Sequence, residues 1–562
     1  DGSTATFQLR FFNGGYTKAV KVELAQAGPD VTGRVLYAKY LQPQNTVNLA
    51  YDFDTGGTPA PIATSVGAPG YGAAFLNANF GADTLVTFAA AGTLSGDVII
   101  DSGRVIVRNK TALGSADLIL GTGAGAPAFY LRDRVDFNNA ITVSGSGTGS
   151  VVIGADNSGS GANPASLTGS LTLNRPTTIS GEVFDDRFAV DGPVTGNVGI
   201  LTIAGGSRTT LRSTANDFAG DIVITGPGTT LQASVNSPGE VIPDASSVTV
   251  ETGTRLLLAS SGGGAETING LHGSGTVATF PDAGFGSTLV IGASNGAGFF
   301  DGSLQNGVNA LALTKTGTDT QVLAGTANYS GPTSINGGTL IIDGDHSASS
   351  SVVTIASGAI LAGTGTLGGP IISTAGSTLA PGNPGGTLTA AGGSTSAGTL
   401  DIQIDGTTAD RLVVNGTLDV SSMILRFSEL SPPLQTSYTI VSATRIIGIP
   451  AANGLPPGYQ LNVESNRIRL AQEGVPGTPK AALLFIHAHP DDETIFGGGV
   501  LPYYAQVRGL PVAVVSMVTR GGNGTNPLTS GGTSRVAELR LSLIHISEPT
   551  RRTIPSRMPS SA

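Results

Sequence analysis

The residues most able to do chemistry lie near the C-terminus, in the string A-H-P-D-D-E at 488–493. His489 and Asp492 are three positions apart on a loop that follows an apolar run, and an imidazole and a carboxylate so placed can reach one cation. Such a donor pair suits zinc and leaves a position open for water. Asp491 could then accept a proton from that water. A structural alternative stays open from spacing alone: Asp491 or Asp492 caps a helix and His489 hydrogen-bonds within the loop.

The flanking segments predict how this loop is positioned. Apolar runs at 481–486 and 512–518 read as buried strands, and 498–508 reads as a helix that stops at Gly509. Strand, loop, helix and strand form one βαβ unit. Because ligands of such sheets bind at the carboxyl ends of the strands, the loop at 488–493 is the expected site.

The string at 488–493, followed by Gly497 and Gly498, resembles the signature of the PIG-L-type zinc deacetylases. The segments T-R-G-G at 519–522 and R-V-A-E at 535–538 follow in that family's order. The resemblance implies hydrolysis of N-acetyl groups from N-acetylglucosaminyl substrates. It also implies that His489 and Asp492 bind Zn²⁺, that Asp491 is the catalytic general base, and that Arg535 lies near the substrate.

The resemblance covers residues 481–540 and is incomplete. The family's third zinc ligand, a His in a later H-x-x-H-type segment, has no counterpart here. The tail at 541–562 begins L-S-L-I-H-I-S-E-P-T-R and resembles the in-frame translation of a transposase-type sequencing adapter. We therefore expect a truncated, inactive unit at 481–540 and a non-native tail. A start at Asp1 without Met is likewise expected to be a trimmed end.

The composition describes a different kind of protein. Of 562 residues, 83 are Gly, 31 are Pro and none is Cys or Trp, while charged residues make up 12%. The glycines have no three-residue period, which excludes collagen, and the lack of thiols excludes disulfide and zinc–thiolate scaffolds. A net charge of −10 argues against nucleic-acid binding. No apolar run is long enough for a membrane span.

Short β runs punctuated by Gly recur between residues 56 and 474, as at 95–100, 219–224, 329–340 and 351–369. Units of this kind cannot bury an apolar face alone, but stacking buries a continuous core. The segment 314–340, with T-K-T-G, N-Y-S-G and I-N-G-G-T-L, resembles the autotransporter-associated β-strand repeat (PATR) of bacterial surface passengers. The expected fold is mainly β: a right-handed parallel β-solenoid.

Asp343, Asp345, Asp405 and Asp410 are candidate catalytic residues within this region, and D-G-D-H at 343–346 could form a metal loop. Ordinary turn chemistry explains Asp next to Gly equally well.

The expected organisation has five parts. They are an antiparallel β unit at 1–55 with strands near 7–11, 20–24 and 35–41, the solenoid at 56–474, a linker at 475–480, the α/β (Rossmann-like) unit at 481–540 and the tail at 541–562. Two functions follow. One is a zinc-dependent deacetylase of N-acetylated sugars or glycans carried on a solenoid. The other is a structural or adhesive protein that contacts cell surfaces or extracellular matrix. Both fit a secreted or surface-exposed bacterial protein.

Overall fold

The computed structural model describes residues 98–473 except 133–134, 157–164, 182–186, 236–238, 261–263, 281–285 and 383–384. It also describes the backbone of seven strands outside that range: residues 6–13, 16–24, 35–37, 75–79, 85–88, 483–487 and 512–516. The predicted strands near the N-terminus, and the runs at 481–486 and 512–518, overlap strands of this set. The helix expected at 498–508 and the tail lie outside the described residues.

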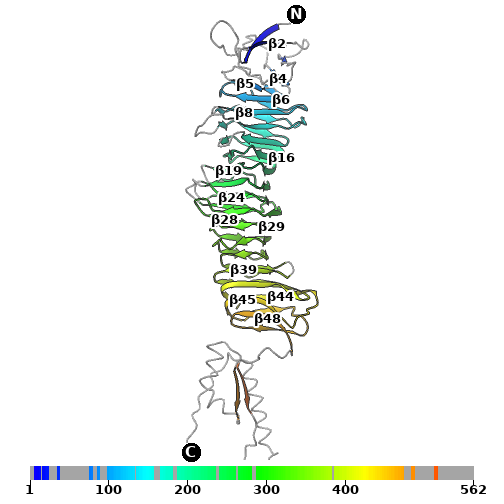
Figure 1. Ribbon diagram of the computed structural model, residues 1–562, viewed down its shortest axis with the longest axis vertical. Coiled ribbons are helices and arrows are strands. Elements are labelled where there is room, and N and C mark those ends of the chain that lie inside the picture. Colours follow the sequence, from blue (N-terminus) through cyan, green and yellow to red (C-terminus); the bar gives the residue numbers. More distant parts are fainter. Residues whose placement is uncertain are drawn as a thin grey trace, which may run out of the picture.

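Throughout the described residues the secondary structure is β, and no helix occurs there. Residues 98–453 form a parallel β-solenoid of about 14 turns. Figure 1 shows the turns stacked along the long axis from β6 to β44. At about 4.8 Å per turn, this stack is about 65 Å long. The mainly β solenoid expected from the sequence is confirmed over this range.

Three long sheets run along the described stack. The largest has 25 strands. Its strands are β1 (Thr6–Asn13), β2 (Tyr16–Leu24), β3 (Val35–Tyr37), β4 (Phe75–Asn79), β5 (Leu85–Phe88), β6 (Val98–Val107), β7 (Leu118–Leu120), β8 (Pro127–Leu131), β10 (Ile141–Val143), β11 (Val152–Ala155), β13 (Leu171–Leu173), β14 (Thr177–Gly181), β16 (Val194–Ala204), β18 (Asp217–Ile224), β20 (Val248–Val250), β23 (Leu271–Gly273), β26 (Gly298–Phe300), β29 (Thr320–Leu323), β32 (Thr339–Ile342), β35 (Ile360–Gly363), β38 (Thr378–Pro381), β41 (Thr399–Asp405), β42 (Thr408–Ala409), β44 (Ile424–Ser431) and β46 (Ala451–Asn453).

The second sheet has 9 strands, which lie between residues 136 and 327. They are β9 (Asp136–Phe137), β12 (Ala165–Leu167), β15 (Arg187–Val190), β17 (Arg208–Leu211), β19 (Thr230–Val235), β21 (Arg255–Ser260), β24 (Thr276–Thr279), β27 (Ser303–Gln305) and β30 (Thr326–Ala327). The third sheet has 14 strands. They are β22 (Ala265–Ile268), β25 (Ser287–Ile291), β28 (Leu311–Lys315), β31 (Thr333–Ile335), β33 (Asp345–His346), β34 (Val353–Ile355), β36 (Thr366–Leu367), β37 (Ile371–Ser373), β39 (Thr387–Ala391), β40 (Ser394–Ser396), β43 (Arg411–Asp419), β45 (Ser437–Ile447), β47 (Tyr459–Val463) and β48 (Arg467–Gln472).

The register places equivalent residues of successive turns on top of one another. Leu340 pairs with Leu361, Leu361 with Leu379, and Leu379 with Leu400, always in parallel strands. All four side chains are buried. Because side chains alternate across a strand, every second residue enters the core, which is why short alternating runs suffice to build it.

The two ends of the described stack differ from its middle. At the N-terminal end β1 and β2 are antiparallel, β2 and β3 are antiparallel, and β3 then pairs in parallel with β4. At the C-terminal end β45 pairs in parallel with β43 and antiparallel with β48, which also pairs with β47. This antiparallel cap was not predicted from the sequence. It covers an edge strand that would otherwise offer unpaired backbone groups.

Candidate functional site

The C-terminal motif follows a strand of a separate parallel pair. Strand β49 (Leu483–His487) pairs in parallel with β50 (Val512–Ser516), and His487 lies opposite Ser516. A parallel pair is what the βαβ interpretation requires, and the motif at 488–493 starts directly after β49. His489, Asp491, Asp492 and Arg535 themselves lie outside the described residues, so their predicted roles stay predictions.

Three candidate carboxylates of the solenoid make structural hydrogen bonds, two of them (Asp343 and Asp405) to the next turn and one (Asp345) within its own turn. Asp343 Oδ1 accepts hydrogen bonds from the backbone N–H of Thr364, at 2.9 Å, and from the Thr364 hydroxyl, at 3.2 Å. Asp345 accepts from the backbone N–H of Ser347 at 2.9 Å. Asp405 accepts from a serine hydroxyl of the neighbouring strand β44. The Asp345 contact is typical of Asp in turns, and those of Asp343 and Asp405 link successive turns.

The fourth candidate, Asp410, is a buried structural acceptor. Its Oδ1 accepts from the backbone N–H groups of Gly385, at 2.8 Å, and Gly386, at 3.3 Å, while Oδ2 accepts from Gln403 at 2.9 Å. Burial raises the pKa of Asp410, although these backbone donors act in the opposite direction. Since its oxygens are used by the backbone, Asp410 has the features of a structural residue.

His346, the last residue of the D-G-D-H string, points into the core rather than toward a metal. It is 2% exposed, and its ring lies edge-on to Tyr329 with the ring centroids 6.5 Å apart. Its Nδ1 has no hydrogen-bond partner. Burial lowers the pKa of His346 to about 4, so the ring is neutral at pH 7. In the described part of the chain, no three His, Asp or Glu side chains converge on a possible metal position.

Two polar side chains of the PATR-like segment are also buried. Lys315 is 1% exposed; its ammonium group donates to the carbonyl of Thr316, and burial lowers the pKa of the amine. Gln321 is completely buried and bonds strand β23 two turns away, accepting from Leu271 N–H at 3.1 Å and donating to Leu271 O at 3.0 Å. Buried polar groups of this kind need partners, and both have them.

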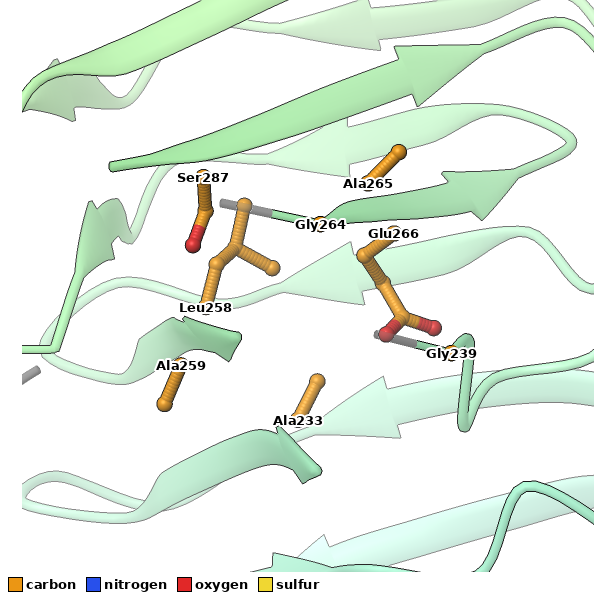
Figure 2. A pocket seen from close by; sticks show the side chains of 8 residues that line it. All are labelled: Ala233, Gly239, Leu258, Ala259, Gly264, Ala265, Glu266 and Ser287. Atoms are coloured by element: carbon orange, nitrogen blue, oxygen red, sulfur yellow. The ribbon is translucent and has the colours of Figure 1, made fainter. Parts of the chain in front are cut away.

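Glu266 is a buried carboxyl that sequence reasoning missed, because one Glu in a short strand carries no local signal. It is 5% exposed and accepts from the backbone N–H of Ile242 at 2.6 Å and of Val241 at 3.2 Å. Burial raises its pKa to about 8. Figure 2 shows its carboxyl group directed toward Gly239 across a small cavity. That cavity, of about 10 Å³, has room for one water molecule at most and none for a substrate.

The surface of the third sheet carries an uncharged outer column. Its members are aligned by the parallel register of β28, β31, β34, β37 and β40: Thr314, Ser334, Thr354, Ile372 and Thr395. The last two positions are the most exposed, with Ile372 at 40%. The column repeats hydroxyl and methyl groups at the spacing of parallel strands, about 4.8 Å. This surface suits contact with another large molecule better than chemistry. Within the described residues there is no helix with the length and apolarity needed to cross a membrane.

Two comparisons bear on the solenoid. A family model described as "Passenger-associated-transport-repeat" matches residues 313–342, which confirms the repeat predicted at 314–340. The "Adhesin BmaC autotransporter" of Brucella suis biovar 1 (strain 1330) is 36% identical over 76 residues. That stretch is 14% of this chain and 2% of the adhesin, so the chain matches only a small part of that relative. The β-solenoid is therefore similar to the passenger regions of autotransporters.

Proposed function

We propose that this chain is the rod-shaped passenger region of a bacterial secreted or surface-exposed protein, with a structural or adhesive role. The observation that carries the proposal is the passenger-type repeat at 313–342 within a solenoid of about 14 turns. In such a rod each turn adds length and repeats the same outer surface.

The side chains of the solenoid support this proposal. Asp343, Asp345, Asp410 and Glu266 all bond to backbone N–H groups, and the cavity beside Glu266 has room for one water molecule at most. The outer column, in contrast, is regular and carries no charged residue from Thr314 to Thr395, the position before Asp419 of β43. The adhesin match agrees with a contact role, but it covers too little of that protein to transfer a partner.

Binding of the purified chain to immobilised matrix proteins and to cell surfaces tests the adhesive role. We expect saturable binding that falls several-fold when Thr354→Asp and Ile372→Asp interrupt the outer column. The matched control is Thr366→Asp with Thr389→Asp. These residues pair on β36 and β39 of the same sheet, outside the outer column, and the control adds the same charge there. When intact cells of the producing bacterium are treated with an added protease, the solenoid, detected with an antibody, should be degraded. Protection from protease together with no binding would contradict the proposal.

A second candidate function is zinc-dependent deacetylation of N-acetylated sugars by the segment at 481–540. It is favoured by the parallel pairing of β49 with β50, directly before the motif. His489 and Asp492 are donors of the types that zinc accepts, and a bound zinc would supply a Lewis acid. Asp491 would accept a proton from water beside it.

The test of this second function begins by re-sequencing the gene past the codon for Arg540. An in-frame H-x-x-H-type segment is expected downstream, and its absence would exclude the enzyme. The extended protein should release acetate from N-acetylglucosaminides, lose that activity with a chelator and regain it with Zn²⁺. Asp491→Asn should abolish turnover while zinc binding, measured by metal analysis, is retained. Full activity of Asp491→Asn would refute the assigned role.

A further inference from the structure

Apolar side chains are exposed mainly at the C-terminal end of the solenoid. Of the eleven large apolar side chains that the described residues expose, six lie within residues 424–455. Three of them, Leu430 (56% exposed), Leu434 (74%) and Leu455 (38%), lie at the end of β44 and in the two loops described next. We call these three leucines the exit surface. The Tyr459 hydroxyl, just after the second of these loops, donates to the carbonyl of Gln435 in the first, so the two loops lie side by side. Neighbouring exposed apolar side chains mark a contact surface more often than scattered ones do.

The chain leaves the solenoid between these two loops. One loop, 432–436, joins β44 to β45, and the other, 454–458, joins β46 to β47. Gln472 N–H donates to Thr436 O at 2.9 Å, and Glu473 N–H donates to Gly458 O at 2.7 Å. The last two residues of the cap are therefore bonded to both loops, and whatever follows Glu473 starts beside the exit surface.

Two tyrosines hold the first loop in place. The Tyr438 hydroxyl accepts from the backbone N–H of Leu434, at 2.8 Å, and of Gln435, at 2.9 Å, and donates to the carbonyl of Gly406. The Tyr459 hydroxyl donates to the carbonyl of Gln435 at 2.6 Å. Because the backbone around Leu434 is already ordered, a partner that covers this leucine has little loop entropy to remove.

We propose that the exit surface is the docking surface for the chain's own C-terminal segment, residues 481–540. Seven residues, 474–480, connect it to Glu473 and span at most about 25 Å. So short a tether gives the segment a millimolar effective concentration at the exit surface. The segment begins with the apolar run A-A-L-L-F-I, and a two-stranded sheet such as β49–β50 needs another surface to cover its apolar face. The proposal does not depend on whether the segment is catalytic.

Limited proteolysis and hydrogen exchange of the full chain test this docking. The variant carries Leu434→Asp and Leu455→Asp, and the control carries Phe299→Asp and Val308→Asp, at side chains 53% and 72% exposed. We expect trypsin to cleave after Lys480 at least tenfold faster in the variant than in the wild type, with no change in the control. Exchange in peptides covering 483–487 should rise in the variant alone.

Cleavage at Arg411 and Arg426 reports whether the solenoid itself is intact, and it should be slow and equal in all three proteins. Equal cleavage after Lys480 in variant and wild type would overturn the proposal. So would a mass that doubles with concentration in the wild type but not in the variant, because a second copy of the chain would then cover the exit surface.

Discussion

The hydroxyl groups of Tyr329 and Thr333 lie 2.7 Å apart in the core of the solenoid. The Thr333 hydroxyl lies 2.8 Å from that of Ser351, which belongs to the next turn. Tyr329 is 2% exposed, and burial raises its pKa to about 12, so its hydroxyl stays protonated. Both Tyr329 and Thr333 lie inside the repeat at 313–342. This repeat therefore supplies polar links between turns as well as apolar stacking.

Truncation of Tyr329 should be much more damaging than removal of its hydroxyl. Tyr329→Ala leaves a cavity and should lower the free energy of unfolding by about 3–5 kcal/mol. Tyr329→Phe should cost about 1 kcal/mol, because Thr333 keeps Ser351 as a partner. Phe299→Ala, at an aromatic residue 53% exposed, is the control and should change stability by less than about 0.5 kcal/mol. Urea unfolding followed by circular dichroism measures all three. Equal losses for Tyr329→Phe and Tyr329→Ala would contradict this account.

Some glycines are required because successive turns approach closely. A Cβ on Gly325 would lie 1.8 Å from the carbonyl oxygen of Gly302, in the turn before it. Gly325→Ala should therefore force the turns apart and lower stability by more than about 2 kcal/mol. At Gly123 a Cβ would meet nothing within 4 Å, so Gly123→Ala should be neutral or slightly stabilising. Comparable unfolding midpoints for the two variants would show that close approach is not what selects Gly325.

Burial of Glu266 should make the solenoid less stable as the pH rises. Its pKa is about 8 in the folded chain against an ordinary 4.5, so between these values the folded state binds more protons than the unfolded state. Stability therefore falls as the pH rises through that window, by an amount on the order of a few kcal/mol. Glu266→Gln should remove this slope, matching the wild type near pH 4.5 and exceeding it at pH 9. If the urea midpoints of the wild type and of Glu266→Gln shift by the same amount between pH 4.5 and pH 9, Glu266 is not a buried neutral carboxyl in the folded chain.

His346 should produce the opposite slope at lower pH. Its pKa is about 4 in the folded chain against an ordinary 6.5, because burial disfavours the charged ring. Between these values the unfolded state binds more protons, so stability falls as the pH drops from 6.5 to 4. His346→Leu should reduce this loss of stability between pH 6.5 and pH 4. The matched control is His272→Leu, at a half-buried ring on β23. The hypothesis fails if both variants keep the acid-side loss of the wild type.

The repeat and its fold could be predicted because their signals are local. A short β-prone run such as Thr339 to Ile342, preceded by Gly337 and Gly338, already indicates a strand after a turn. The same pattern recurring every twenty or so residues predicts stacking, since no unit can bury its face alone. Lys315 and Gln321 could not be recognised as buried, because their burial depends on which turn lies above and below. Glu266 and the cap strands β45, β47 and β48 depend equally on contacts between distant segments.

By itself, the sequence determined that the chain is β-rich, that its middle is repetitive and passenger-like, and that one motif at 488–493 carries zinc-type donors. These are properties of composition and short spacing, and short-range sterics and hydrophobic periodicity enforce them. Only the tertiary structure decided what the solenoid's polar residues do. Asp343 and Asp410 could equally have been catalytic from the sequence alone, until the register placed the backbone N–H groups of another turn or loop within reach of each carboxylate. Register is a long-range property, set when many turns stack at once, and no single segment contains it.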